Sequence, residues 1–312
     1  FHWKGLGTDE IFATRSNPDS PFAITNDMSE ADFFVLPMHW SYYLWNSKAK
    51  MDEAIRLTEL AREAKKKIII WFKGDLVPKI PFENAIIFLP GAMRSGVEDS
   101  YRACPVFIDD PDPVFRNNGS AQYRNKSAKP SVGFCGYGAV GGLKMTWSVL
   151  KGTQLNLASR YGHYDFSAVP IIPATLLRAK ALRLLSKHPK VDGNFVIRRQ
   201  YTGQNSGAAS HRQEAANVFF SNIYENDYTL CMRGYGNWSY RFYQTLACGR
   251  IPVFVDTDCL LPLPTVDWKK YCVWIELSEL KYIGEKVADF HSSISSSDFL
   301  ELQVSCRKLW KE

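Results

Sequence analysis

The chain has 312 residues, of which 46% are hydrophobic and 14% aromatic, and its formal net charge at pH 7 is +6. This length suits two domains of ordinary size with well-buried cores, so the composition indicates a globular protein and excludes a disordered one. The basic residues are spread along the chain, with residues 65–67 as the tightest cluster. The charge therefore favours small anionic ligands such as nucleotide diphosphates, and we expect no nucleic-acid partner.

Seven cysteines without a C-x-x-C pair argue against a disulfide framework and a zinc site, and they favour a reducing compartment. The sequence shows neither a signal peptide nor an apolar run of membrane length, so we expect a cytoplasmic protein with no membrane span in this chain. We also expect that a chain starting at Phe1 has been trimmed, so a membrane anchor upstream of this residue is a remaining alternative.

Apolar runs alternate with a helical pattern in the first half of the chain. Strands are predicted at 33–38, 67–72, 85–90 and 105–109, and a helix at 48–66. This alternation is typical of an open α/β sheet.

A connection rich in Asp, Pro, Asn, Gly and Ser follows at 109–131, where DDPD at 109–112 is predicted to form a turn. We therefore expect an N-terminal domain at 1–127 and a C-terminal domain at 128–312.

The second half begins with a strand that runs into glycines, SVGFCGYG at 131–138, which predicts either a tight turn or a close approach to a ligand. The helices predicted after it lie near 143–160, 173–187, 210–224, 278–291 and 297–311.

Residues 228–262, YTLCMRGYGNWSYRFYQTLACGRIPVFVDTDCLLP, predict a strand, a loop, a helix and a second strand. Gly234, Gly236 and Asn237 mark the loop, which follows the carboxyl end of the first strand, where open α/β sheets bind ligands. Either Asn237 or Ser239 is expected to cap the helix, and Gly249 to end it.

Two arginines flank the amino terminus of this helix. Arg233 lies in the glycine loop and Arg241 in the first turn, where free N–H groups and the helix dipole favour an anion. Guanidinium groups bind phosphate oxygens in a bidentate way, so the pair suits a diphosphate. A surface ion pair between Arg241 and a carboxylate is the alternative.

The order C-x-R-G-x-G-N-x-S-x-R-F-Y-x-x-L-x-x-G-R-I-P-V, followed by DTDCLLP and Asp267-Trp268, resembles the exostosin-type glycosyltransferases of family 47. EADFFVLPMHW upstream resembles a strand of that family's amino domain. The resemblance implies a GT-B fold, in which two Rossmann-like α/β domains face a central cleft. It also implies a nucleotide-sugar donor held by the C-terminal domain, sugar transfer with inversion, and a last helix, ending at Trp310, that crosses back to the amino domain.

One position departs from the family pattern. Many members carry Glu where this chain has Gln244, and such a carboxylate often binds the ribose hydroxyls of the donor; a Gln accepts hydrogen bonds only through its carbonyl and without charge. The expected donor-binding residues are Arg233, Gly234, Gly236, Asn237, Ser239, Arg241 and Gln244.

Asp256 and Asp258 open a competing interpretation. A strand ending in D-x-D is also how GT-A glycosyltransferases hold Mn²⁺ or Mg²⁺, because carboxylates are hard oxygen ligands. The glycine loop and the arginines favour a site without metal, so we expect neither a metal ion nor a cofactor.

An inverting transferase needs a base that takes the proton of the acceptor hydroxyl. His39 and Asp75 follow strands of the amino half and are the first candidates, and His163 and Asp165 are further ones. The alternative for His39 is packing among the neighbouring aromatic residues.

We therefore expect an inverting hexosyl- or pentosyltransferase that moves a sugar from a nucleotide diphosphate donor, UDP-linked, to a carbohydrate acceptor during glycan or polysaccharide synthesis. A noncatalytic nucleotide-sugar- or carbohydrate-binding module, suggested by Gln244, and a metal-dependent GT-A enzyme are the alternatives.

Overall fold

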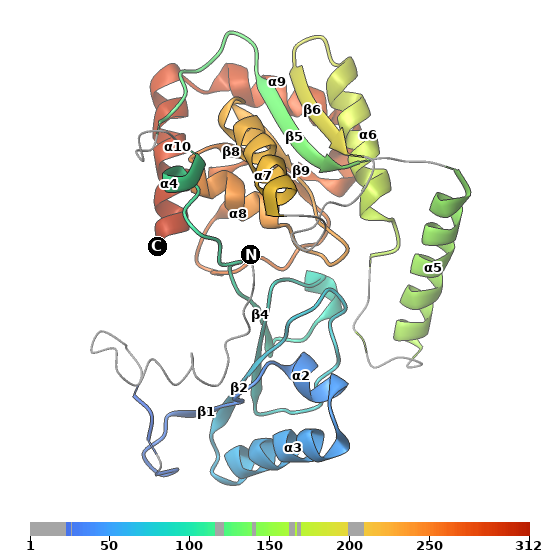
Figure 1. Ribbon diagram of the computed structural model, residues 1–312, viewed down its shortest axis with the longest axis vertical. Coiled ribbons are helices and arrows are strands. Elements are labelled where there is room, and N and C mark those ends of the chain that lie inside the picture. Colours follow the sequence, from blue (N-terminus) through green and yellow to red (C-terminus); the bar gives the residue numbers. More distant parts are fainter. Residues whose placement is uncertain are drawn as a thin grey trace.

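A computed structural model describes residues 23–25, 27–115, 122–138, 142–161, 166, 170–198 and 209–312. The described chain is an α/β protein with two parallel sheets, which lie in separate lobes in Figure 1. The sequence correctly predicts this class. His163 and Asp165, two of the candidate bases, lie outside the described residues.

The first sheet is parallel and has the strand order β1-β2-β3-β4. Every second residue of its central strands is buried, as for Ile68 and Ile70 on one strand and Ile87 and Leu89 on the next, which is the period expected of a sheet that packs a core. The strands are β1 (Phe33–Val35), β2 (Lys67–Trp71), β3 (Ala85–Leu89) and β4 (Tyr101–Ala103), and the helices of this lobe are α2 (Trp40–Trp45), α3 (Lys48–Glu63) and the 3-10 helix η2 (Arg94–Gly96).

The second sheet is also parallel and has the order β6-β5-β7-β8-β9. The chain steps outward from β5 to β6 and then returns to the other side of β5, so the winding reverses between β5 and β7. The strands are β5 (Ser131–Tyr137), β6 (Asp192–Arg198), β7 (Tyr228–Cys231), β8 (Ile251–Asp256) and β9 (Val273–Glu276).

Helices cover both faces of the second sheet. Residues of β7 and β8 that point one way, such as Leu230 and Val253, pack with α6 and α9. Cys231 and Phe254 point the other way and pack with α8 and α10. Central strands buried on both faces read as continuous apolar runs, as these do. The helices of this half are α4 (Asp112–Phe115), α5 (Gly142–Arg160), α6 (Ala174–Lys187), α7 (Ala209–Tyr224), α8 (Tyr240–Ala247), α9 (Ile283–Ser293) and α10 (Ser296–Lys311), with 3-10 helices η3 (Trp268–Tyr271) and η4 (Leu277–Tyr282).

Most predicted elements are present, but three expectations need correction. The run at 105–109 is not a strand; the fourth strand is β4, a short segment just before it. Gly133 and Gly136 lie inside β5 and not in a loop after it. The helical spacing of Trp238, Phe242, Leu246 and Ala247 predicts a buried stripe, but Trp238 precedes α8 and is only half-buried, so it is not part of that stripe.

The two strands β6 and β9 and the short helix α2 were not among the predicted elements. β9 and α2 are short, with four and six residues, and β6 is an exposed edge strand with little apolar periodicity.

The predicted boundary near 127 falls in the connection between the two sheets, after β4 and before β5. α10 packs against α8, β8 and η3 of the second sheet. From this helix Arg307 forms ion pairs with Asp110 and Asp112 in the connection, at 2.6 and 3.1 Å. The last helix therefore packs on the C-terminal half and forms ion pairs with the connection.

The carboxyl ends of strands from both sheets meet. The segment after β3 joins the segment after β8, where Met93 and Cys259 form an antiparallel bridge and the Leu260 amide donates to the Ala92 carbonyl at 3.0 Å. Within the described ranges, no helix is both long and apolar enough to cross a membrane.

Candidate functional site

The candidate site lies where the winding of the second sheet reverses. In open α/β sheets, ligands bind outside the carboxyl ends of the strands at such a reversal, because the two flanking connections leave in opposite directions and open a crevice. Here the reversal separates β5 from β7, and the glycine loop predicted from the sequence follows β7.

The loop after β7 is closed on itself. The Gly234 amide donates to the Trp238 carbonyl at 2.8 Å, which brings the two ends of the loop together. Asn237 fixes the loop from inside: its Nδ2 donates to the carbonyls of Ala92 and Thr257, both at 3.1 Å, and its Oδ1 accepts from the Thr257 hydroxyl at 2.7 Å. The Asn237 side chain is buried and fully used by the protein, so it shapes the loop and has no capacity left for a ligand.

Arg233 is buried at the start of this loop, with only 3% of its surface exposed. Its guanidinium donates to backbone carbonyls, among them those of Gly234 at 3.2 Å and of Ile172. Its Nε is buried without a hydrogen-bond partner. Burial lowers the pKa of Arg233 to about 10, so the side chain is still charged at neutral pH.

Arg241 lies across β5. Its Nη2 donates to the Cys135 carbonyl at 2.7 Å, and the guanidinium carbon is 4.2 Å from the centre of the Phe134 ring. Gly136 allows this position, because a Cβ there would come within 2.6 Å of Nη2. Burial is the main cause that lowers the pKa of Arg241 to about 10, and its Nε also has no hydrogen-bond partner.

Neither arginine has a counter-charge in the part of the chain that the structure describes. Among these described residues, no carboxylate acts on the Arg233 or the Arg241 guanidinium, and the basic groups that act on Arg241 are Arg178 and Arg198. A buried charge without a partner costs several kcal/mol. The alternative prediction, a surface ion pair between Arg241 and a carboxylate, is wrong for the described residues, because none of their carboxylates pairs with Arg241.

Arg178 was not predicted from the sequence. From α6 it donates to the Tyr137 carbonyl at the end of β5, at 2.6 Å, and to the Arg233 carbonyl after β7, at 3.1 Å. It thus bridges the two strands at which the winding reverses. Arg178 lies on α6, in a stretch without a recognisable motif, so no sequence signal pointed to it. Arg198 ends β6, a strand that was itself not predicted, so the sequence did not point to this residue either.

Other buried arginines of the chain show what a structural arginine looks like here. Arg307 pairs with Asp110 and Asp112. Arg250 donates to carbonyls that include Tyr224 at 2.9 Å and to Gln303 Oε1 at 3.3 Å. Arg307 thus has carboxylate partners, which Arg233 and Arg241 lack among the described residues, and Arg250 donates to more acceptors than either of them.

The remaining predicted donor residues lie around the arginines. Gln244 is one turn beyond Arg241 on α8 and half-buried, and among the described residues its amide has no hydrogen-bond partner. Ser239 occupies the N-cap position of α8, but its side chain makes no capping bond. A Cβ on Gly234 would meet only the Trp238 carbonyl at 3.8 Å, so space remains beside this glycine.

Asp256 and Asp258 contact the amino half. Asp256 is buried and accepts from the Cys259 amide at 2.8 Å and from Arg94 at 3.3 Å. Asp258 accepts from the Ser95 amide at 3.0 Å and lies 3.5 Å from Arg94 Nε. These carboxylates join the two lobes, and no group of three metal-binding side chains occurs among the described residues.

Asp75, a candidate base, also reaches across. Its Oδ1 accepts from the Gly236 amide and from Trp238 Nε1, both at 3.1 Å. The structure thus brings Asp75 to the predicted donor loop.

His39 caps α2. Its Nδ1 accepts from the Tyr42 amide at 3.1 Å, so the neutral ring carries its proton on Nε2 and has no free nitrogen to accept another. Burial and, less strongly, Lys73 lower the pKa of His39, which favours this neutral form. To act as a base, His39 would first have to break the hydrogen bond between its Nδ1 and the Tyr42 amide.

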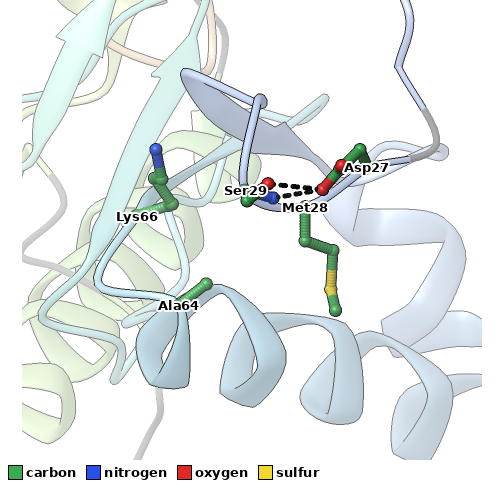
Figure 2. A pocket seen from close by; sticks show the side chains of 5 residues that line it. All are labelled: Asp27, Met28, Ser29, Ala64 and Lys66. Atoms are coloured by element: carbon green, nitrogen blue, oxygen red, sulfur yellow. Dashed lines mark hydrogen bonds between the residues drawn. The ribbon is translucent and has the colours of Figure 1, made fainter.

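A separate hollow lies away from these residues (Figure 2). It is lined by Asp27, Met28 and Ser29 on one side and by Ala64 and Lys66, in the connection between α3 and β2, on the other. The hydrogen bonds drawn within it join Ser29 to Asp27 alone. It contains none of the predicted site residues.

No protein-family model matches this chain, and no curated protein sequence matches it.

Proposed function

We propose that the protein binds a nucleoside diphosphate sugar at the reversal between β5 and β7 and transfers the sugar to a carbohydrate acceptor. The carrying observation is that Arg233 is buried and Arg241 half-buried there, and that among the described residues neither guanidinium has a carboxylate partner. A ligand with two phosphates supplies the missing negative charge, and charge-assisted bonds to guanidinium groups are among the strongest available to a protein.

Two further features support a nucleotide. The side-chain amide of Gln244, which has no hydrogen-bond partner among the described residues, lies one turn from Arg241 and offers both a donor and an acceptor to a ribose or a sugar hydroxyl. The loop that carries Arg233 follows a parallel strand at its carboxyl end, the usual position for nucleotide binding in this class of sheet. The loop sequence is also the part that resembles the exostosin-type family.

The contact between the lobes supports a GT-B arrangement. Segments after β2 and β3 of the first sheet meet segments after β7 and β8 of the second, so both sheets turn their carboxyl ends toward one junction. In our proposal, the donor lies on the C-terminal side of this junction and the acceptor on the amino side.

The metal-dependent alternative has less support. Both oxygens of Asp256 already accept hydrogen bonds, and Asp258 is engaged by Ser95 and Arg94. The noncatalytic alternative keeps a specific observation in its favour: His39 is used as a helix cap, so the structure gives no ready base at that position.

The test is a thermal-shift and calorimetric titration with UDP, UMP, uridine, and UDP-sugars. Ligands that bind the native state raise its apparent stability by mass action. We expect UDP to bind at least tenfold more tightly than UMP, because the second phosphate meets a second guanidinium. Equal affinity for UDP and uridine would overturn the diphosphate site. Binding without product in an acceptor screen would favour the noncatalytic module.

A further inference from the structure

Asp75 is the amino-half side chain that holds the tip of the predicted donor loop. One oxygen, Oδ1, accepts from both the Gly236 amide and the Trp238 indole, each at 3.1 Å. The contact requires glycine at 236, because a Cβ there would lie 2.6 Å from the same oxygen.

The segment that presents Asp75 is itself fixed. The amide of Phe72 donates to the Phe88 carbonyl at 2.8 Å, which continues the pairing of β2 with β3. The buried hydroxyl of Ser41, from α2, donates to the Lys73 carbonyl at 2.6 Å. The carboxylate therefore extends from an anchored turn.

The loop that receives Asp75 carries Arg233 at its start. The bond from the Gly234 amide to the Trp238 carbonyl closes this loop, so a constraint on Gly236 and Trp238 also limits the movement of Arg233. The first sheet makes a second close contact with the loop at Gly91, where a Cβ would lie 2.7 Å from the Trp238 Cβ.

We propose that Asp75 is a positioning residue for the donor site: it holds the loop 233–239 from the opposite lobe, so that Arg233 is preorganised for a diphosphate. This inference rests on the proposed function, and it assigns Asp75 a role other than the catalytic base expected from the sequence. Preorganisation matters because a charged side chain on a mobile loop loses conformational entropy when it binds a ligand.

Two substitutions separate the two roles. Asp75→Asn keeps a carbonyl oxygen that accepts from both N–H groups but removes the basic carboxylate, whereas Asp75→Ala removes the acceptor. We expect D75N to bind UDP within about threefold of the wild type and to keep turnover. We expect D75A to bind UDP about tenfold or more weakly, since two hydrogen bonds that hold the loop are lost.

A second readout does not depend on any ligand. Amide hydrogen exchange of residues 233–239 in the ligand-free protein is expected to speed up in D75A and to stay near wild type in D75N, because exchange reports local opening. Ser95→Ala is the matched control: it removes the hydrogen bond from the Ser95 hydroxyl to Asp258, which joins the lobes, but none of the Asp75 bonds. It is expected to leave exchange in the loop and UDP affinity unchanged.

The positioning role is overturned if D75N abolishes turnover as fully as D75A while UDP affinity and loop exchange stay at wild-type values; Asp75 is then the base. It is also overturned if D75A leaves loop exchange unchanged. If the wild type binds no UDP, the donor site itself fails, and faster exchange in D75A would then show only that the loop is held.

Discussion

Replacing Arg241 with Met tests whether this buried charge serves a ligand or the fold. Methionine keeps a long flexible side chain against Phe134 but removes the guanidinium. Lowering the pKa of Arg241 from its ordinary 12.5 to about 10 corresponds to roughly 3 kcal/mol that disfavours the charged form in the folded protein. This free energy is released in R241M.

The substitution also removes favourable interactions. The bond from Nη2 to the Cys135 carbonyl contributes about 1 to 1.5 kcal/mol, and the contact with the Phe134 ring about 1 kcal/mol. These losses nearly balance the relief of the buried charge. We therefore expect the free energy of unfolding of ligand-free R241M to lie within about 1 kcal/mol of the wild type, but its UDP binding to be weaker by about 2 to 4 kcal/mol.

Urea unfolding measures the first quantity and isothermal titration calorimetry with UDP the second. Arg250→Met is the matched control, because that arginine donates to several carbonyls and to Gln303. We expect R250M to lose about 3 kcal/mol or more of stability, since those acceptors are left buried and unpaired. Our interpretation of Arg241 is refuted if R241M is destabilised as much as R250M, or if it binds UDP as well as the wild type does.

The remaining predictions concern metal, the glycine beneath Arg241, and His39. Sugar transfer is expected to continue in excess EDTA, because guanidinium groups balance the leaving diphosphate; loss of turnover that Mn²⁺ restores would make Asp256 and Asp258 metal ligands. Gly136→Ala places a Cβ 2.6 Å from Arg241 Nη2 and is expected to weaken UDP binding about tenfold or more in calorimetry, with an unchanged affinity as the contrary result. The pKa of His39 is lowered in the folded protein, so its contribution to stability is present at neutral pH and is lost as pH falls below about 6.5. Protonation removes the Nδ1 cap, which is worth about 0.5 to 2 kcal/mol, so His39→Asn is expected to lose less stability than the wild type between pH 7 and pH 5 in urea unfolding; equal losses would contradict the capping role.

Local sequence patterns were sufficient to assign the proposed site to the second half of the chain. The strand β7, the glycine loop and α8 are adjacent in the sequence, and their turn residues and apolar spacing predict this unit directly. Arg233 and Arg241 belong to the same stretch, so the sequence alone assigns one to the loop after β7 and the other to the first turn of α8. The α/β class follows likewise from alternating strands and helices.

The partners of these side chains depend on contacts between distant segments. Asn237 resembles a ligand-binding residue in the sequence, but its side-chain amide donates to the Ala92 and Thr257 carbonyls. Asp256 and Asp258 resemble a metal motif but meet Arg94 and Ser95, more than 150 positions earlier in the chain. A sequence pattern shows which groups a residue carries and not which other groups already use them.

The sequence by itself determined the α/β class, the strand–loop–helix–strand unit and the two arginines within it, because each depends on spacing within a few turns of chain. Only the tertiary structure decided that Arg178 joins them and that Asp75 reaches the loop, since these contacts are 55 and 161 residues apart in sequence. The strand order, with its reversal between β5 and β7, likewise depends on the tertiary structure. Sheet order is fixed by how whole helices pack on the two faces, and this packing involves the entire C-terminal half of the chain.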